Sequence, residues 1–508
     1  MKYASTLTAI PAGGVDIALV RAEAVVRRGI PRWEMAANKT VMERIRAALV
    51  QTGYSIPFAT VIAHLSPAQA ARPGSQVDLS IAASILGALD ALPESSAALA
   101  ARALWLGEVA LSGEILPVKN CLVFLLGARR QGVEHVILSE QQRSDAVLPG
   151  MRYTFVRTLQ CLRRLPQPEP IQSALSVTVP TASLDHLELS TTLKRALCIS
   201  AAGWHSMLLI GPPGTGKSTV ARQIASLLPP PTEEEALEIR AIENVESPGS
   251  STFPVVRPVR IPHHSATAVA LAGGGKPLRI GEATRAHNGI LLLDELAEFS
   301  RPALQALREP MTESSVHVSR NATSTILPAN FLLLATSNAC PCGNHGHSTL
   351  RCNCLPVQVQ NYFNRIYGPL SDRIALEVLV TRNQLESGAN SRKEGISSAF
   401  MLKAVRGAVE RQARRFKKES FRFNGQIPAA RLEEFIPELN HAVGETNEWG
   451  KILESLNGRT QRKLHGILRV ARTIADLDGA EDVRAVHLRE AASFFCLELL
   501  RVNGRENA

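Results

Sequence analysis

The chain has no hydrophobic segment long enough to cross a membrane. None of the apolar runs in its 508 residues reaches the roughly 18 residues that a spanning helix requires. Near the start, Pro11, the Gly13–Gly14 pair and Asp16 interrupt any apolar core of a signal peptide. We therefore expect a cytoplasmic protein without a membrane segment, and the length indicates about three domains.

Aromatic residues are also scarce. They make up 5% of the chain, which argues against base stacking as the main way of binding nucleic acid. The formal net charge is +10, which favours a polyanionic partner held through its phosphates, although many basic proteins bind no nucleic acid.

A phosphate-binding loop is the strongest signal in the sequence. The segment Gly211-Pro-Pro-Gly-Thr-Gly-Lys-Ser218 follows an apolar run, 207–210, and precedes a segment with helical spacing of apolar residues, 219–228. A strand, a glycine-rich turn and a helix N-terminus form a phosphate cradle because backbone N–H groups face the anion. We predict that Lys217 contacts the β- and γ-phosphates of ATP and that Ser218 binds Mg²⁺. The predicted nucleotide-binding residues of the loop are Gly211, Pro212, Pro213, Gly214, Thr215, Gly216, Lys217, Ser218 and Thr219.

Two further apolar runs are predicted to be strands that end at the same site. The run 289–293 ends in Asp294 and Glu295, a Walker B pattern. We predict that Asp294 holds Mg²⁺ and binds the nucleotide through it, and that Glu295 activates the attacking water. The run 330–337 ends in Asn338. An amide there can help to place that water, although an asparagine after a strand is more often a turn former.

We expect an α/β protein, and breaks in composition divide the chain into several domains. A stiff Pro-rich segment and a polar Gly/Ser-bearing segment separate three blocks. The path from Lys217 to Asp294 is longer than the ~50 residues of a minimal strand–helix–strand–helix–strand connection, which predicts an insertion. Its glycine-rich loop could reach into a pore, or it could pack on the surface of its own domain. The predicted segments are an N-terminal domain (1–165), a linker (166–180), a doubly wound core (181–385) with an insertion (255–285), and a helical C-terminal domain (396–508).

Four of the eight cysteines form a cluster in the sequence. They make two C-x-C pairs, and four thiolates could close a structural tetrahedral Zn²⁺ site. C-x-C pairs are less usual than C-x-x-C pairs, so reduced free thiols are the alternative. The clustered residues are Cys340, Cys342, Cys352 and Cys354, within the segment 340–354.

These motifs together resemble the magnesium-chelatase-like AAA+ proteins of the ComM and YifB type. The matching strings extend over nearly the whole chain. The resemblance implies a homo-hexamer with a Lon-protease-like α+β N-terminal domain, an AAA+ P-loop core and an α-helical C-terminal lid. It also implies ATP-driven translocation on single-stranded or branched DNA and branch migration of recombination intermediates during natural transformation. The strings are GPPGTGKS, PHHSAT followed by GGG, GEATRAHNGILLLDELAEF, LREPMTESSVHVSR, GPLSDRIALEV and ILRVARTIADLDG.

Three further site residues follow from the resemblance, and a fourth, Lys276, from the glycine-rich loop of the insertion. Arg373 matches the arginine finger, which acts on the γ-phosphate of the neighbouring subunit. Arg462 matches the nucleotide-binding sensor-2 arginine, although its Arg-rich segment leaves a surface role open, and this chain has Gly466 where the family usually has a further arginine. The segment 316–329 resembles the hairpin that lines the pore, so Arg320 is expected to contact DNA phosphates. Lys276, in the insertion, is the second predicted DNA contact.

The N-terminal block resembles a Lon-type fold but lacks the Ser–Lys pair of the protease site. Gln76 stands where the serine belongs, and Leu122 and Phe124 occupy the lysine region. Ser75 and Lys119 are near misses in sequence. We therefore expect a structural or partner-binding domain.

Two functions remain open at this point. The first is an ATPase that translocates on DNA as a branch-migration helicase. The alternative is a chelatase-type motor that remodels a protein or metal-insertion partner, which the few basic residues of the 316–329 hairpin favour. A basic run, 411–422, is either a solvated helix face or a contact with the DNA backbone at the rim of a ring.

Overall fold

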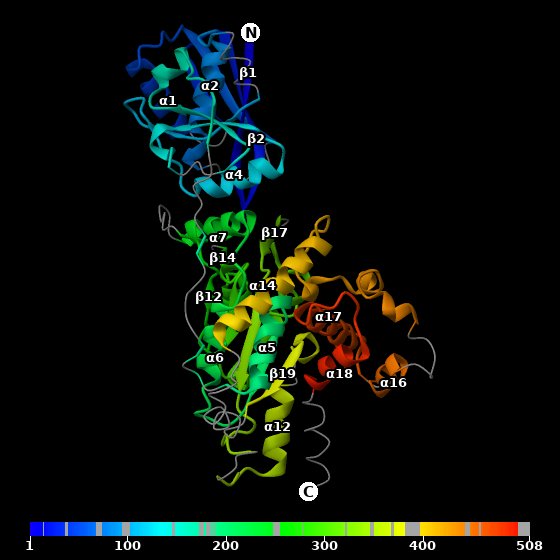
Figure 1. Cartoon of the computed structure of the whole chain (residues 1–508). Helices are drawn as coiled ribbons and strands as arrows, with labels where there is room; N and C mark the ends of the chain where they lie inside the picture. Colours follow the sequence, from blue (N-terminus) through cyan, green and yellow to red (C-terminus); the bar gives the residue numbers. More distant parts are fainter. Residues whose placement is uncertain are drawn as a thin grey trace. The chain divides into compact units, whose positions relative to one another are not determined.

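The structure is a computed structural model in which the chain forms two compact units (Figure 1). The first unit comprises 1–176 with the segments 233–255 and 317–327, and the second comprises 177–232, 256–316 and 328–508. The described residues are 1–13, 15–35, 39–67, 74–93, 102–144, 148–171, 177–178, 184–185, 187, 189–246, 254–276, 278–320, 323–345, 350–366, 370–380, 397–441, 448–456 and 459–495.

An eight-stranded mixed sheet forms the centre of the first unit, in the order β10-β9-β8-β5-β1-β2-β4-β3. β1 (Lys2–Gly13) and β2 (Asp16–Arg28) pair as a long antiparallel hairpin, and β4 (Ala59–Ser66) extends it. Alternate residues of β2 are buried, as expected for a strand with one face on a core. The other strands are β3 (Arg32–Met35), β5 (Leu104–Trp105), β8 (His135–Ser139), β9 (Arg152–Val156) and β10 (Glu169–Pro170), with β6 (Glu108–Val109) and β7 (Ile115–Leu116) in a separate pair.

Helices α1 (Lys39–Gln51), α2 (Asp78–Ala88) and α4 (Cys121–Arg130) supply the helical part of this unit's cores. A further helix, α7 (Glu233–Glu246), comes from the segment between the two nucleotide motifs. Its Leu237 and Ala241 share a hydrophobic core with α4, and Arg130 forms an ion pair with Glu238. The path between the motifs therefore includes a helix that belongs to the first unit.

A five-stranded parallel sheet forms the centre of the second unit, in the order β12-β15-β18-β11-β19. β11 (Met207–Ile210), β15 (Ile290–Leu293) and β18 (Leu332–Ser337) are fully buried, which explains their continuous apolar runs. The edge strands are β12 (Val259–Arg260) and β19 (Leu376–Leu379). The predicted insertion, 255–285, thus contains one core strand, because the prolines around β12 leave it only two residues long and hide it in the sequence.

The helical C-terminal segment shares one hydrophobic core with this sheet. α14 (Ser398–Arg415) and α17 (Gln461–Leu477) pack against α5 (Thr191–Gly203), and Phe423 stacks on Trp204 at the end of α5 with ring centroids 5.1 Å apart. The other helices of this segment are α15 (Leu432–Phe435), α16 (Glu448–Ser455) and α18 (Ala485–Ser493).

The remaining α-helices of the second unit lie between the strands of this sheet in the sequence. They are α6 (Lys217–Gln223), α8 (Ala268–Ala272), α9 (Glu282–Arg285), α10 (Arg301–Ala306), α11 (Pro310–Glu313) and α12 (Pro356–Ile366). Two hairpins lie between them in the sequence: β13 (Gly273–Gly274) with β14 (Arg279–Ile280), and β16 (Ser315–Arg320) with β17 (Thr323–Pro328). The mixed α/β class and the parallel sheet agree with the predicted fold. Within the described ranges, every helix is too short or too polar to span a bilayer.

Candidate nucleotide-binding site

The predicted phosphate-binding loop connects β11 to α6. Gly214 and Gly216 have φ angles of +77° and +70°, a left-handed region that glycine adopts more readily than other residues. A Cβ atom at Gly211 would lie 2.1 Å from the carbonyl oxygen of Val380, so a side chain does not fit there beside the end of β19. The glycines of the motif are therefore required by the backbone path of the loop.

Lys217 is buried within this loop and surrounded by oxygen acceptors. Its Nζ donates to the carbonyl oxygens of Gly211 at 2.8 Å and Pro212 at 2.7 Å, and to Oδ1 of Asn338 at 3.3 Å. Burial lowers the pKa of Lys217 to about 8, and the negative charges of Asp294 and Glu295 oppose that shift. A desolvated ammonium group in this position is suited to binding phosphate oxygens.

Asp294 lies at the carboxyl end of β15, between two hydroxyl groups. Ser218 Oγ donates to its Oδ1 at 2.6 Å, and Thr336 Oγ1 donates to the same oxygen at 2.5 Å. Mg²⁺ prefers hydroxyl, carboxylate and water oxygens as ligands. The donor set therefore fits a magnesium ion that Ser218 and Asp294 would hold.

Glu295 has a different environment from Asp294. Its backbone is left-handed, with φ 58° and ψ 56°, a conformation that costs a non-glycine residue about 1–3 kcal/mol. Its backbone N–H donates to Thr336 Oγ1 at 3.2 Å, and its side chain is 57% exposed. The Oε2 atom lies 4.0 Å from Nδ1 of His264, in the loop after β12. The carboxylate thus faces solvent, where a water molecule can reach it.

We predict that His264 positions Glu295. Replacing His264 with Ala should lower kcat for ATP hydrolysis by up to about 10²-fold, because a misplacement of about 1 Å at a reacting group can cost that much. The KM for ATP should change little, since the contact that His264 makes in the described part of this site is with Glu295 and not with the phosphate-binding loop. Steady-state kinetics of His264→Ala and His264→Gln check this. Equal loss in both variants, or a rise in KM alone, would contradict a positioning role.

The topology explains why these residues meet. β15, β18 and β11 are adjacent and parallel, so the residues after their carboxyl ends lie along one edge of the sheet. This edge brings together Lys217, Ser218, Asp294 and Asn338 through the hydrogen bonds given above. Thr336 was not predicted from the sequence; its Oγ1 donates to the carboxylate of Asp294 and accepts from the backbone N–H of Glu295. Its signal in the sequence is a hydroxyl residue directly after the apolar run 332–335 of β18, two residues before Asn338.

The two predicted arginines lie at the opposite edge of the sheet. Arg373 contacts Ser206, the residue directly before β11. The Oγ of Ser206 donates to the carbonyl oxygen of Arg373 at 2.7 Å. β11 has four residues, so this edge is about 13 Å from the phosphate-binding loop along the strand. Arg373 and Arg462 line one cavity of 470 Å³ there. Burial lowers the pKa of Arg373, and the positive charges of Arg462 and Arg308 add to the effect.

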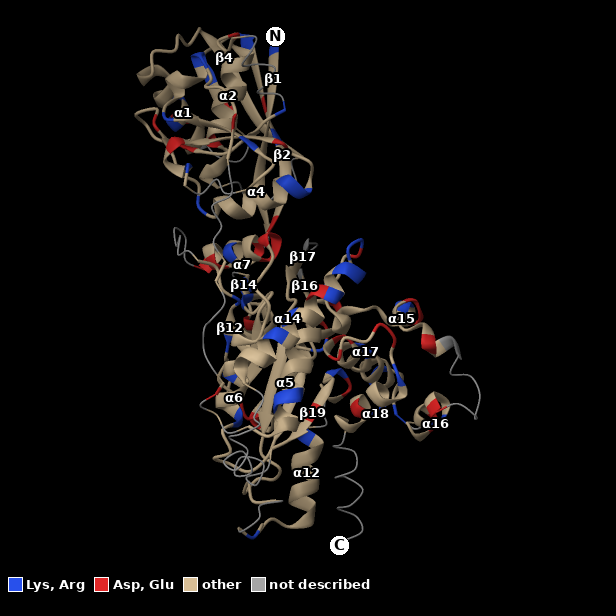
Figure 2. Ribbon diagram, in the orientation of Figure 1, with Lys and Arg blue, Asp and Glu red and all other residues tan. Residues whose placement is uncertain are grey.

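The predicted DNA contacts belong to two β-hairpins. Lys276 is exposed in the turn between β13 and β14. Arg320 ends β16, and its side chain lies outside the described residues. In the basic run 411–422, Arg415 is bound to Asp476, whereas Arg414, Lys417 and Lys418 are exposed. Figure 2 shows basic residues in blue at the C-terminal end of α14. The run therefore divides into a structural part and a solvent-facing part.

Among the described residues, the near misses of the protease motif, Ser75 and Lys119, do not form a Ser–Lys pair. Ser75 Oγ donates to a carboxylate oxygen of Glu108 at 2.6 Å, and Lys119 is exposed beside the start of α4. Gln76 is buried. A carboxylate partner does not lower the pKa of a serine hydroxyl as a neighbouring cation would.

The sheet order, the glycine-rich loop after β11 and the adjacent acids after β15 fit the AAA+ class of P-loop ATPases. Comparison with known families agrees. The family described as magnesium chelatase, subunit ChlI, matches residues 184–387. Subunit ChlI of Mg-chelatase matches 23–142, and the ChlI C-terminal family matches 395–494.

Individual relatives define the family more closely. YifB of Salmonella typhimurium, an uncharacterized protein, is 34% identical over 502 residues, 96% of each chain. The competence protein ComM of Haemophilus influenzae is 33% identical over 497 residues, 95% of each chain. The 38 kDa magnesium-chelatase subunit of Cereibacter sphaeroides is 26% identical over 61% of this chain and 89% of its own length. The chain belongs to the ComM and YifB family of magnesium-chelatase-like proteins, which implies ATPase activity with ATP and Mg²⁺.

Proposed function

We propose that the protein is an ATP-hydrolysing AAA+ motor that assembles as a homo-hexamer, translocates on DNA and promotes branch migration of recombination intermediates. The observation that carries the proposal is the division of the site between the two edges of one sheet. Phosphate-binding and water-activating residues lie at the carboxyl edge, and Arg373 and Arg462 lie at the amino edge. A complete ATP site therefore needs the carboxyl edge of one subunit and the amino edge of a neighbouring copy.

The carboxyl edge binds ATP and prepares the attacking water. Lys217 and the loop around Gly214 hold the phosphates, while Ser218 and Asp294 would hold Mg²⁺, which neutralises charge on the phosphate oxygens. Glu295 accepts a proton from the water that attacks the γ-phosphorus, and the bond to ADP breaks. Asn338, whose Oδ1 accepts a hydrogen bond from Lys217, orients the γ-phosphate and the water.

The amino edge supplies cations to the next subunit. The Nε of Arg373 donates to the carbonyl oxygen of Arg308 at 3.2 Å and to Thr312 Oγ1 at 3.1 Å, which fixes the direction of its side chain. Arg462 is exposed at the start of α17 and lines the same cavity. Both guanidinium groups act on the γ-phosphate of a neighbour, so hydrolysis depends on contact between subunits.

The DNA part of the proposal draws on charge and on the competence relative. The relative ComM is named a competence protein, and competence is the uptake of DNA by cells. This chain has a net charge of +10, with exposed cations at Lys276, Arg414, Lys417 and Lys418. These lysines and arginines are suited to phosphates and carry no base-reading pattern, so binding should be independent of sequence.

We expect Lys276→Ala and Arg320→Ala to weaken DNA binding equally for all sequences. Each phosphate contact that is lost should lower the slope of log K against log salt by about 0.7–0.9, because fewer counterions are released. Hydrolysis without DNA should persist, since neither residue is part of the nucleotide site. Fluorescence anisotropy across a salt series checks the result, with Lys451→Ala on α16 as a matched loss of one exposed lysine. An unchanged slope in both DNA-contact variants would remove them from the interface.

A second function is supported by the chelatase relative. The magnesium-chelatase subunit of C. sphaeroides is similar over 61% of this chain. A motor of that type would remodel a protein or metal-insertion partner with the same ATP site. The two functions differ in their stimulus, because only the DNA motor should hydrolyse ATP faster when DNA is added.

We propose that the remaining parts support the motor. The segment 1–165 would be a Lon-protease-like domain without protease activity, consistent with Ser75 bonding Glu108. The helical segment 396–508 would be the lid, and the linker 166–180 would join the N-terminal domain to the core, 181–385. α14 and α17 pack on α5, so movement of the lid would be transmitted to the sheet.

A further inference from the structure

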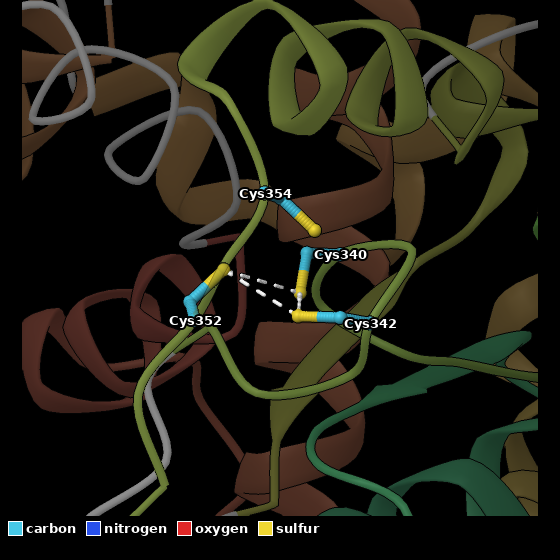
Figure 3. Close-up of side chains that lie close together, drawn as sticks. All are labelled: Cys340, Cys342, Cys352 and Cys354. Atoms are coloured by element: carbon cyan, nitrogen blue, oxygen red, sulfur yellow. Dashed lines mark hydrogen bonds between the residues drawn. The ribbon is translucent and has the colours of Figure 1, made fainter.

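The four clustered cysteines lie within reach of one ion (Figure 3). Their Sγ atoms are all within 4.8 Å of one another. Cys340 Sγ is 3.4 Å from Cys342 Sγ and 3.7 Å from Cys352 Sγ, and Cys342 Sγ is 3.6 Å from Cys352 Sγ. The side chains come from two chain segments, on either side of residues 346–349, and all four point inward in Figure 3.

These distances fit one metal ion with four thiolate ligands. Zn–S bonds of about 2.3 Å in a tetrahedron place neighbouring sulfur atoms about 3.8 Å apart. The backbone N–H of His345 donates to Cys340 Sγ at 3.2 Å, the type of bond that supports a thiolate ligand. The His345 ring packs edge-on against Phe363 with centroids 6.4 Å apart, so the described ligand set is the four sulfurs.

We propose that Cys340, Cys342, Cys352 and Cys354 hold one Zn²⁺ ion, and that this zinc site braces the ATP site of the motor. Tetrahedral tetrathiolate coordination is typical of zinc. With four protein ligands, no position is open for a substrate, so the ion is structural.

Three connections join the cluster to the ATP site. Cys340 follows Asn338 by two residues, so the first ligand fixes the end of β18 where Asn338 contacts Lys217. A Cβ at Gly343, the residue directly after the first C-x-C pair, would lie 2.6 Å from Cδ of Pro213 in the phosphate-binding loop. Cys354 lies two residues before the start of α12, which packs against η5 (Leu296–Glu298), the turn that follows Glu295. The metal would therefore tie together the loop, the sensor residue and the turn after the catalytic acid.

The metal is tested by elemental analysis of the full chain purified under reducing conditions. We expect about one zinc per chain, and Co²⁺ substituted for zinc should show the absorption of a tetrahedral tetrathiolate site. Cys352→Ser should lower the zinc content and the melting temperature, whereas Cys161→Ser, a half-buried thiol outside the cluster, should change neither. Iron at the same stoichiometry, or metal-free protein with four freely reactive thiols, would overturn the proposal. This readout is independent of ATP or DNA, so its failure would leave the motor function untouched.

The brace is tested by substitutions that leave all four thiols in place. Gly343→Ala adds a methyl group against Pro213, and Gly150→Ala adds one at a similar φ, +80° against +81°, with no atom within 4 Å. Both variants should keep about one zinc per chain. Only Gly343→Ala should weaken the binding of a fluorescent ATP analogue, by about ten-fold or more, because a displacement of about 1 Å in a site has effects of this order. Equal nucleotide affinity in the two variants would show that the zinc site does not support the ATP site.

Discussion

The Glu295→Gln protein is expected to bind ATP with nearly unchanged affinity and to hydrolyse it about 10²–10⁴-fold more slowly, the range associated with removal of a general base. Glu295 is exposed to solvent, while Ser218 and Thr336 bond to Asp294 instead. An amide has the same shape as the carboxylate but cannot accept the proton from water. Binding of a fluorescent ATP analogue and steady-state phosphate release measure the two effects separately.

Glu298→Gln provides the matched control for that experiment. Glu298 lies in η5, three residues after Glu295, and is exposed, so the same change of charge is made close to the site without touching it. Its turnover should equal that of the unaltered protein. Full turnover in Glu295→Gln, or an equal loss in both variants, would remove Glu295 from the role of general base.

Loss of Arg373 is expected to have an effect at least as large. Arg373→Ala should reduce ATP hydrolysis by about 10³–10⁵-fold, the range associated with an arginine finger. The reason is geometric, since Arg373 lies at the amino edge of the sheet and Lys217 at the carboxyl edge of the same subunit. A mixture of Arg373→Ala and Lys217→Ala subunits should recover part of the activity, because some interfaces then combine an intact loop with an intact arginine.

Arg406→Ala is the control for this mixture. Arg406 is exposed on α14 and lies outside the cavity shared by Arg373 and Arg462, so its loss should leave hydrolysis unchanged. Normal hydrolysis by Arg373→Ala alone would show that Arg373 is not an arginine finger. Two inactive variants that stay inactive when mixed, although they co-assemble, would show that the residues do not act across an interface.

The parts of the site that were predictable from sequence are those with short-range signals. The apolar runs before Gly211, Asp294 and Asn338 are buried parallel strands, and such strands appear in a sequence as continuous hydrophobic segments. The glycines of the loop have positive φ angles or a close backbone neighbour, which is why the motif has glycine at these positions. The roles assigned to these residues stay predictions until they are measured.

The parts that were not predictable depend on long-range contacts. The strand β12 is two residues long and lies among prolines, so no periodicity marks it. Helix α7 lies between the nucleotide motifs yet packs on α4, more than a hundred residues earlier, which a local pattern cannot reveal. His264 meets Glu295 only because β12 is paired with β15. The four cysteines were found by their spacing, but their contact with Pro213 through Gly343 required the structure.

The most direct measurement of the central claim is the processing of a labelled synthetic four-way DNA junction with ATP and Mg²⁺. We predict that the unaltered protein converts the junction to duplex products, that ATP hydrolysis rises when the junction is added, and that Glu295→Gln binds the junction without converting it. Lack of conversion, together with hydrolysis that DNA does not stimulate and binding that salt does not weaken, would contradict a DNA motor and favour one that remodels a protein partner.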